Sequence, residues 1–148
     1  MVSGDRDLLQ VVGPQVPLFM PKGQDGDIYT PAAVTERWGV RRAQIPDLTA
    51  VIGDPSDHIP GVPGIGPKSA AALLARHETL DGLYATLPAL PARQADVLRA
   101  HRERVVLNRR LVRIVRTVDV PTARAAYRWA RADTGTADTL LAARGLRG

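Results

Sequence analysis

The sequence predicts a mainly α-helical chain with one short β-hairpin near its N-terminus. Residues 92–116 form a long helical pattern without Gly or Pro, which favours helix over any other element there. The hairpin is predicted by two short β-like runs, 16–20 and 28–29, which flank a loop of turn-forming residues at 21–26. Val2-Ser3 reads as the end of a further strand.

Most of the expected helices are bounded by residues that start or stop helices. Thr30 is a capping residue, Pro31 suits the first helical position, and Gly39 stops the helix. Gly53 ends the next helix, and Pro67 begins the one after it. We therefore expect helices over 31–38, 46–52, 67–76, 80–86 and 92–116, an extended segment at 118–121, and a weak helix over 136–143.

The composition is that of an ordinary globular protein. The chain has 148 residues, 45% hydrophobic and 24% charged, which fits one domain of modest size and excludes wholesale disorder. The absence of cysteine excludes disulfides, thiolate catalysis and Cys-based zinc sites. No apolar stretch approaches the roughly 18 residues of a membrane span, and no secretory signal opens the chain. We expect a soluble cytoplasmic protein.

Charge is divided unevenly along the chain. Residues 1–74 carry six Lys or Arg and eight Asp or Glu, whereas residues 75–148 carry fourteen and seven. An acidic half beside a basic half suits a protein that binds cations at one place and polyanions at another. A GC-rich genome is an alternative source of the many arginines.

The segment Gly61-Val62-Pro63-Gly64-Ile65-Gly66-Pro67-Lys68 is the most informative part of the sequence. Its glycines let the backbone approach another surface and expose N–H groups, and the helix beginning at Pro67 adds free N–H groups and a positive dipole end. Lys68 supplies a mobile positive charge. The pattern predicts a phosphate site of the kind that positions a DNA backbone without reading its sequence. The alternative is a turn that only joins two helices.

Two pairs of aspartates stand out among the acidic residues. Asp5 and Asp7 are two apart, and Asp54 and Asp57 are three apart at the start of the glycine-rich segment. Paired carboxylates in turns suit a hard divalent cation such as Mg²⁺. From the residues alone, helix caps and solvated turns explain each pair more simply.

Five arginines of the expected 92–116 helix share one helical face, opposite Leu107, Leu111 and Ile114. They form either a strip that contacts DNA phosphates or an ordinary solvated face, and the same two readings apply to Arg41 and Arg42. The arginines of the strip are Arg99, Arg102, Arg109, Arg113 and Arg116.

Two segments, Ser3–Gln10 and Gly53–Lys68, resemble the 5′-3′ exonuclease/flap endonuclease family. The closest likeness is to the exonuclease domain of bacterial DNA polymerase I and its free-standing relatives, and it extends from residue 2 to about residue 120. The second segment carries a highly specific motif. One departure is His58, because Asn is usual at this position in the family.

The resemblance implies a role for each motif. Residues 48–74 correspond to a helix-three-turn-helix motif that grips the duplex backbone and holds K⁺ through carbonyls. Its phosphate-facing residues would be Gly61, Gly64, Gly66 and Lys68. If the arginine strip contacts DNA rather than solvent, we expect Arg109 and Arg113 to be among its DNA-binding residues. The acidic cluster that holds two divalent metals, Mg²⁺ or Mn²⁺, matches Asp5, Asp7, Asp54 and Asp57.

The family's nuclease domain begins well before residue 1, so we expect this chain to be the C-terminal half of an α/β 5′-3′ exonuclease domain. Residues 1–30 would be a remnant of the catalytic sheet, 31–120 the DNA-binding subdomain and 121–148 a polar tail. The implied activity is flap-processing hydrolysis of DNA phosphodiesters, completed by a missing N-terminal region or a separate chain. The alternatives are a non-catalytic, sequence-independent duplex DNA-binding module and a truncated chain that does not fold stably.

Overall fold

The computed structural model describes residues 1–123 and 134–144. The chain divides into two compact units, Met1–Val115 and Arg116–Gly148. The first unit is mostly helical and carries one antiparallel hairpin near its start, which confirms the predicted mainly α fold. Within the described ranges, no helix is both long enough and apolar enough to cross a membrane.

The hairpin consists of β1 (Leu18–Lys22) and β2 (Asp25–Tyr29), with Leu18 opposite Tyr29. Its turn is tighter than the sequence suggested, because both strands extend into the loop of turn-forming residues. Gly23 takes a φ of 63° in this turn, a conformation that favours glycine. The predicted hairpin is confirmed; its first strand is shifted toward the turn and its second strand is longer than expected.

A third segment pairs with the hairpin at the start of the chain. Val2 forms a parallel bridge with Phe19 of β1. The N–H of Ser3 donates to the carbonyl of Phe19 at 3.0 Å, and the N–H of Phe19 donates to the carbonyl of Met1 at 2.8 Å. Val2-Ser3 therefore has the extended, paired character that its sequence predicts.

The helices begin and end close to the predicted capping residues. At α1, the hydroxyl of Thr30 accepts a hydrogen bond from the N–H of Ala33 at 3.2 Å, and Gly39 ends the helix with a φ of 70°. The other elements, in chain order, are η1 (Arg6–Val11), α1 (Pro31–Trp38), η2 (Arg42–Gln44), α2 (Ile45–Ile52), β3 (Gly53–Asp54), β4 (Ile59–Pro60), α3 (Pro67–His77), α4 (Leu80–Ala85), η3 (Leu87–Ala89), α5 (Ala92–Ala100), α6 (Arg102–Val112) and, in the second unit, α7 (Thr134–Ala143).

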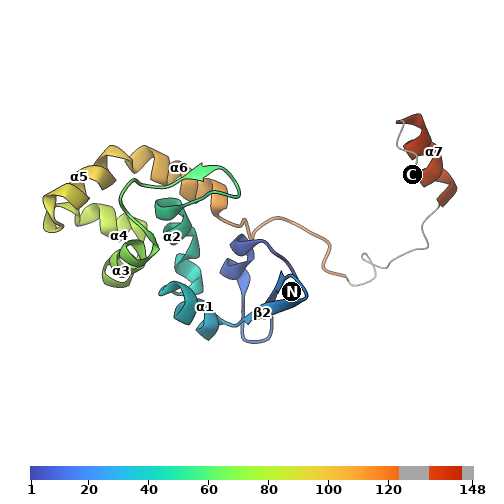
Figure 1. Cartoon of the computed structure of the whole chain (residues 1–148), viewed down its shortest axis with the longest axis horizontal. Helices are drawn as coiled ribbons and strands as arrows, with labels where there is room; N and C mark the ends of the chain where they lie inside the picture. The colour runs from blue at the N-terminus through green and yellow to red at the C-terminus, as the bar shows by residue number, and fades with distance from the viewer. Residues whose placement is uncertain (124–133, 145–148) are drawn as a thin grey trace. The chain divides into compact units, whose positions relative to one another are not determined.

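Helix α2 lies at the centre of the first unit and contacts α6, α3 and η1 (Figure 1). Its side chains Ile45, Leu48, Ala50 and Val51 are buried in one continuous hydrophobic core. Burial of a side chain the size of Leu contributes roughly 1.5–3 kcal/mol. The core therefore fixes the end of α2, and with it the position of the glycine-rich segment that follows.

The predicted single helix over 92–116 is wrong. The structure has two helices, α5 and α6, which meet at His101. The N–H of His101 donates to the carbonyls of Val97 and Arg99, and its ring Nδ1 lies 2.9 Å from the oxygen of Val97. His101 has a φ of −106° and a ψ of 11°, outside the α-helical range, so the regular helix is interrupted at this residue. Beyond Val112 the chain is extended, so the five arginines lie on two helices and the segment after them.

The predicted apolar face of this region is also wrong. Leu107 and Leu111 are 49% and 63% exposed, while Val105, Asn108 and Val112 are buried. Helix α6 turns a polar residue inward because Asn108 finds hydrogen-bond partners in the core, as described below. The two leucines consequently face outward.

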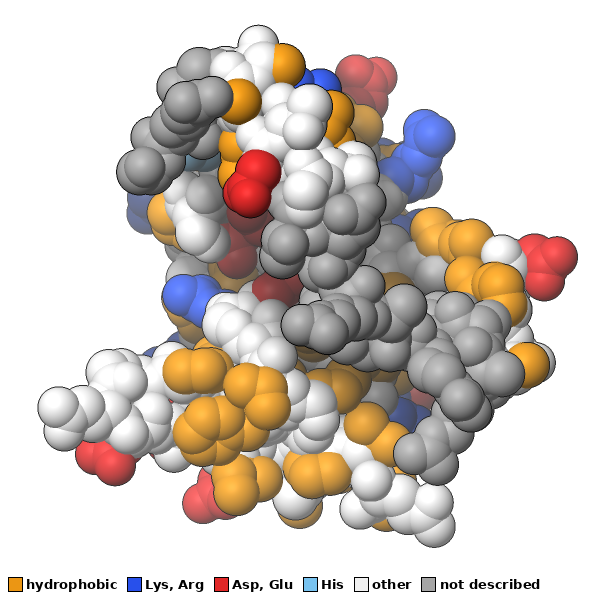
Figure 2. Space-filling view, turned by 90° about the vertical axis from the view of Figure 1, so that its right-hand side faces the viewer, with side chains coloured by type: hydrophobic (Ala, Val, Ile, Leu, Met, Phe, Trp, Pro, Cys, Tyr) orange, Lys and Arg blue, Asp and Glu red, His pale blue; other side chains and the backbone are white. Residues whose placement is uncertain are grey.

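Other hydrophobic side chains are exposed on the molecule. Several orange groups are visible on the face shown in Figure 2. Large exposed hydrophobic residues include Val2 at 73%, Ile28 at 63% and Val16 at 46%. The start of the chain and its hairpin therefore carry exposed apolar side chains.

Candidate nucleic-acid interface and carboxylate cluster

The glycine loop (residues 61–66) joins the short antiparallel pair β3–β4 to α3. Two buried side chains, Val62 and Ile65, anchor it in the core. The N–H of Val62 donates to the carbonyl of Val51 in α2 at 2.7 Å, and the N–H of Ile65 donates to the carbonyl of Val62 at 3.2 Å. These contacts fix the loop against the end of α2.

The three glycines that were predicted to face phosphate occupy two different environments. At Gly61, a Cβ atom would lie 2.1 Å from the carbonyl oxygen of Ile52, so the backbone there needs glycine in order to pack. At Gly64 and Gly66 a Cβ atom would meet nothing within 4 Å, and both residues are exposed. Gly64 has a φ of 76°, which favours glycine. The outer side of the loop is thus formed by Gly64 and Gly66.

The first turn of α3 adds N–H groups and a charge to this outer side. Gly66 is the N-cap and supplies no side-chain cap, and Pro67 has no N–H. The N–H groups of Lys68 and Ser69 lie in the first turn, where helix geometry provides no acceptor. The side chain of Lys68 is exposed. Free N–H groups, the helix dipole and a lysine together favour an anion.

Asn108 holds the loop from inside, a role that the sequence pattern did not reveal. Its side chain is 1% exposed. Its Nδ2 donates to the carbonyl of Ala50 in α2 at 3.0 Å and to the carbonyl of Pro60, just before the loop, at 2.9 Å. The amide therefore ties α6, α2 and the start of the loop together. An Asn directly after three apolar residues, Val105, Val106 and Leu107, was the available signal.

Among the four predicted carboxylates, Asp7 is influenced by the charges of the other three. Asp5 caps η1, because its Oδ1 accepts a hydrogen bond from the N–H of Asp7 at 2.8 Å. Asp7 is half-buried. Burial, together with the negative charges of Asp5, Asp57 and Asp54, raises the pKa of Asp7 to about 6. The negative charges of the other three carboxylates thus disfavour the charged form of Asp7, and a cation beside it would offset that repulsion.

Asp54 is the most deeply placed of the four. Its side chain is 7% exposed, and its Oδ1 accepts hydrogen bonds from the N–H of Ser56 at 2.9 Å and from the Ser56 hydroxyl. These bonds hold the pKa of Asp54 below its usual value, and the charge of Arg6 lowers it further. Among the described residues, no three acidic or His side chains converge closely enough to hold a metal ion. The donor chemistry fits a hard cation, but the set is incomplete.

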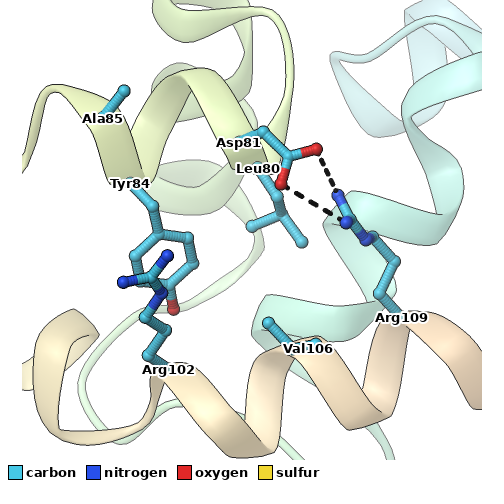
Figure 3. A pocket seen from close by; sticks show the side chains of 7 residues that line it. All are labelled: Leu80, Asp81, Tyr84, Ala85, Arg102, Val106 and Arg109. Atoms are coloured by element: carbon cyan, nitrogen blue, oxygen red, sulfur yellow. Dashed lines mark hydrogen bonds and ion pairs between the residues drawn. The ribbon is translucent and has the colours of Figure 1, made fainter.

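The two arginines predicted to contact DNA differ in their surroundings. Arg109 forms two hydrogen bonds to the carboxylate of Asp81, at 3.0 and 3.3 Å (Figure 3). Its Nη1 also lies 3.8 Å from Oδ1 of Asp47. Its side chain is 24% exposed. In the same pocket, Arg102 lies over the ring of Tyr84, 5.4 Å from its centroid. Arg109 therefore forms ion pairs that link α6 to α4 and α2. Its contact with DNA stays a prediction.

Arg113 follows the end of α6 and is exposed. The end of α6 is fixed by Gln10 of η1, whose Nε2 donates to the carbonyl of Val112 at 2.7 Å. The Oε1 of Gln10 accepts from the N–H of Ile114 at 3.2 Å. This side chain links the segment that carries Asp5 and Asp7 to the segment that carries Arg113.

Comparison with known proteins identifies the class. Residues 40–135 match the family described as 5′-3′ exonuclease, C-terminal SAM fold. The chain belongs to this 5′-3′ exonuclease family, which confirms the resemblance seen in its motifs.

The individual relatives are DNA-processing enzymes. The chain is 42% identical over 123 residues to DNA polymerase I of Mycobacterium leprae, an alignment that covers 82% of this chain and 13% of that protein. It superposes on a bacteriophage T5 flap endonuclease, in a complex with DNA and metal ions, with a TM-score of 0.66 and 26% identity over 75% of this chain and 41% of that one. A T5 5′-exonuclease with divalent zinc ions gives a TM-score of 0.66 and 27% identity over 75% of this chain and 41% of that one. The chain thus spans a small part of the curated relative and less than half of either phage structure.

Proposed function

We propose that this chain grips duplex DNA through its glycine loop and the first turn of α3, as part of a flap-processing 5′-3′ exonuclease. The observation that carries the proposal is the outer side of the loop, where Gly64 and Gly66 leave open space beside the free N–H groups of α3 and the exposed Lys68. Backbone N–H groups contact phosphates without reading bases, so binding is independent of sequence. Residues 31–120 form the DNA-binding subdomain, and Arg113 and Arg109 extend the contact.

Asp5, Asp7, Asp54 and Asp57 supply part of a site for Mg²⁺ or Mn²⁺. Divalent metals in such a site would polarise the phosphodiester and activate water for in-line attack. In this chain, Ser56 orients the carboxylate of Asp54, and Asp5 orders the turn that carries Asp7. Burial and, to a smaller extent, repulsion by the other carboxylates raise the pKa of Asp7, and a bound cation would offset the repulsion. K⁺ would bind carbonyls of the glycine loop.

Further ligands would come from a preceding region of the domain or from a separate chain. The phage flap endonuclease, with DNA and metal ions, is more than twice as long as the part that this chain matches. The uncovered apolar surface around Val2 and Ile28 is consistent with such a neighbour. We place the assembled protein in the cytoplasm, where its DNA substrate lies.

The second candidate function is a non-catalytic duplex DNA-binding module. It is favoured by the incomplete carboxylate set, because no three ligands converge among the described residues. Both candidate functions include duplex binding through the glycine loop, and they differ only in whether the DNA is cleaved.

The grip is tested by measuring the binding of a fluorescent duplex across a range of salt concentrations. The expected result is equal affinity for two duplexes of unrelated sequence and a linear fall of log K with log salt. Lys68→Ala should weaken binding and reduce the salt slope by about 1, and Gly64→Val should weaken it further. The matched control is Lys22→Ala, an exposed lysine of the hairpin. If Lys68→Ala and Gly64→Val together leave affinity unchanged at low salt, the loop is not the grip.

A further inference from the structure

A groove lies beside the glycine loop, between α1, η1 and the first turn of α3. Its volume is about 870 Å³. Side chains from segments far apart in the sequence line it, among them Arg6, Arg37, Trp38, Ile52, Lys68 and Ser69. No motif in the sequence joins these residues, so the fold alone brings them together.

Three cations border this α1–α3 groove. Arg6 comes from η1, Arg37 from the last turn of α1 and Lys68 from the first turn of α3, and all three are exposed. None of them takes part in the ion pairs formed within the described part of the chain, which involve Arg41, Arg99 and Arg109. Three exposed positive charges around one groove repel one another and attract a polyanion.

The floor of the groove is apolar and suits the sugar and base surfaces of a nucleic acid. Trp38 is half-buried and packs on Tyr29, with ring centroids 4.9 Å apart. Ile52 and Ala71 complete the floor. The guanidinium of Arg37 lies 5.8 Å from the centroid of the Trp38 ring, so a cation and a flat aromatic surface are adjacent. Such a combination binds nucleic acid strands without sequence preference.

The two ends of the groove lie at the two parts of the candidate site. Lys68 lies in the first turn of α3, directly after the glycine loop, and Arg6 lies between Asp5 and Asp7 at the start of η1. An anion bound along the groove therefore extends from the glycine loop to the edge of the carboxylate cluster.

We propose that the α1–α3 groove binds the phosphodiester backbone of a DNA strand through Arg37 and Arg6, and so leads that strand from the glycine loop to the carboxylate cluster. The proposal rests on the proposed DNA-binding function and adds a second contact to it. The ligand chemistry is a phosphate, which a free phosphate ion could also supply, and the experiment separates the two sources.

The test uses Trp38 as a reporter inside the groove. The chain has two tryptophans, and the second, Trp129, lies outside the described residues, so Trp129→Phe leaves Trp38 as the sole tryptophan signal. Titration with a DNA duplex should change the Trp38 fluorescence until the site is saturated. Inorganic phosphate should give no saturable change in Trp38 fluorescence over the concentration range in which DNA remains bound. If phosphate alone saturates the signal with an affinity like that of DNA, the groove is not a site for a DNA strand.

The decisive variant is Arg37→Ala in the Trp129→Phe background. We expect a roughly fivefold to tenfold loss of DNA affinity and a salt slope smaller by about 1, with Arg37→Lys retaining most of the binding. The matched control is Arg93→Ala, an exposed arginine of α5 that does not line the groove. Thermal unfolding of each variant establishes that it folds.

The failures of the two proposals give different results. If Lys68→Ala weakens DNA binding while Arg37→Ala behaves like Arg93→Ala, the groove proposal is overturned and the loop grip stands. If the Trp129→Phe chain binds no DNA at all, the proposed function falls and the groove proposal falls with it.

Discussion

Gly61→Ala should destabilise the chain strongly, because Gly61 is where the loop backbone packs on α2. The new Cβ would lie 2.1 Å from the oxygen and 2.3 Å from the carbonyl carbon of Ile52. Both are main-chain atoms and cannot swing away. Overpacking costs about 1–3 kcal/mol, and shifting the loop also breaks the 2.7 Å bond from Val62 N–H to Val51, worth about 1 kcal/mol. The expected loss is about 2–4 kcal/mol of unfolding free energy.

Urea unfolding followed by circular dichroism measures this loss. With a slope of about 2 kcal/mol/M, the midpoint should fall by about 1–2 M at an unchanged slope. The matched control is Gly66→Ala, where a Cβ meets nothing within 4 Å and φ is −85°. It should unfold within about 1 kcal/mol of the parent and bind DNA more weakly, since its methyl group lies on the outer side of the loop. Equal stability of the two variants would refute the assignment of Gly61 to packing and Gly66 to the surface.

Three further predictions concern single side chains. Asn108→Leu leaves the carbonyls of Ala50 and Pro60 without their donor and should cost about 1–3 kcal/mol in the same urea assay; an unchanged midpoint would show that the amide does not hold the loop. Glu78 has a φ of 65°, so Glu78→Gly should stabilise by about 0.5–1 kcal/mol, and a lower melting temperature would contradict the strain. The raised pKa of Asp7 means that the folded state binds the carboxyl proton more tightly than the unfolded state does. The protonated carboxyl therefore adds to stability below about pH 4, and this contribution is lost as the pH rises through about 6. Asp7→Asn should therefore be more stable than the parent at pH 7, by at most about 1 kcal/mol after solvent screening, and equal to it at pH 4; melting curves at both pH values check this.

Local signals were sufficient for much of the fold. Thr30 and Gly39 bound α1 as their chemistry predicts, because caps act within one turn of the helix. Pro67 likewise begins α3. The break at His101 escaped prediction because no Gly or Pro marks it; the backbone leaves the helical dihedral range at that one residue.

The features that the sequence did not predict depend on contacts between residues far apart in the chain. Asn108 is buried and Leu107 is exposed because the Asn108 amide donates hydrogen bonds to the main-chain carbonyls of Ala50 and Pro60, which belong to distant elements. No sequence motif connects Arg37 with Arg6 or Lys68. Only the fold places the three side chains around one groove. The carboxylates were identified through their motif, whereas their mutual influence on Asp7 required the structure.

The most direct test of the account uses the purified chain, a labelled 5′-flap duplex, and Mg²⁺ or EDTA. Each sample is divided between a mobility-shift gel and a cleavage gel. Because the chain carries the loop grip but an incomplete carboxylate set, it should shift the duplex in both conditions and cleave it in neither. Mg²⁺-dependent cleavage that disappears in Asp54→Ala/Asp57→Ala would show that four carboxylates suffice, and the absence of any shift would contradict the grip itself.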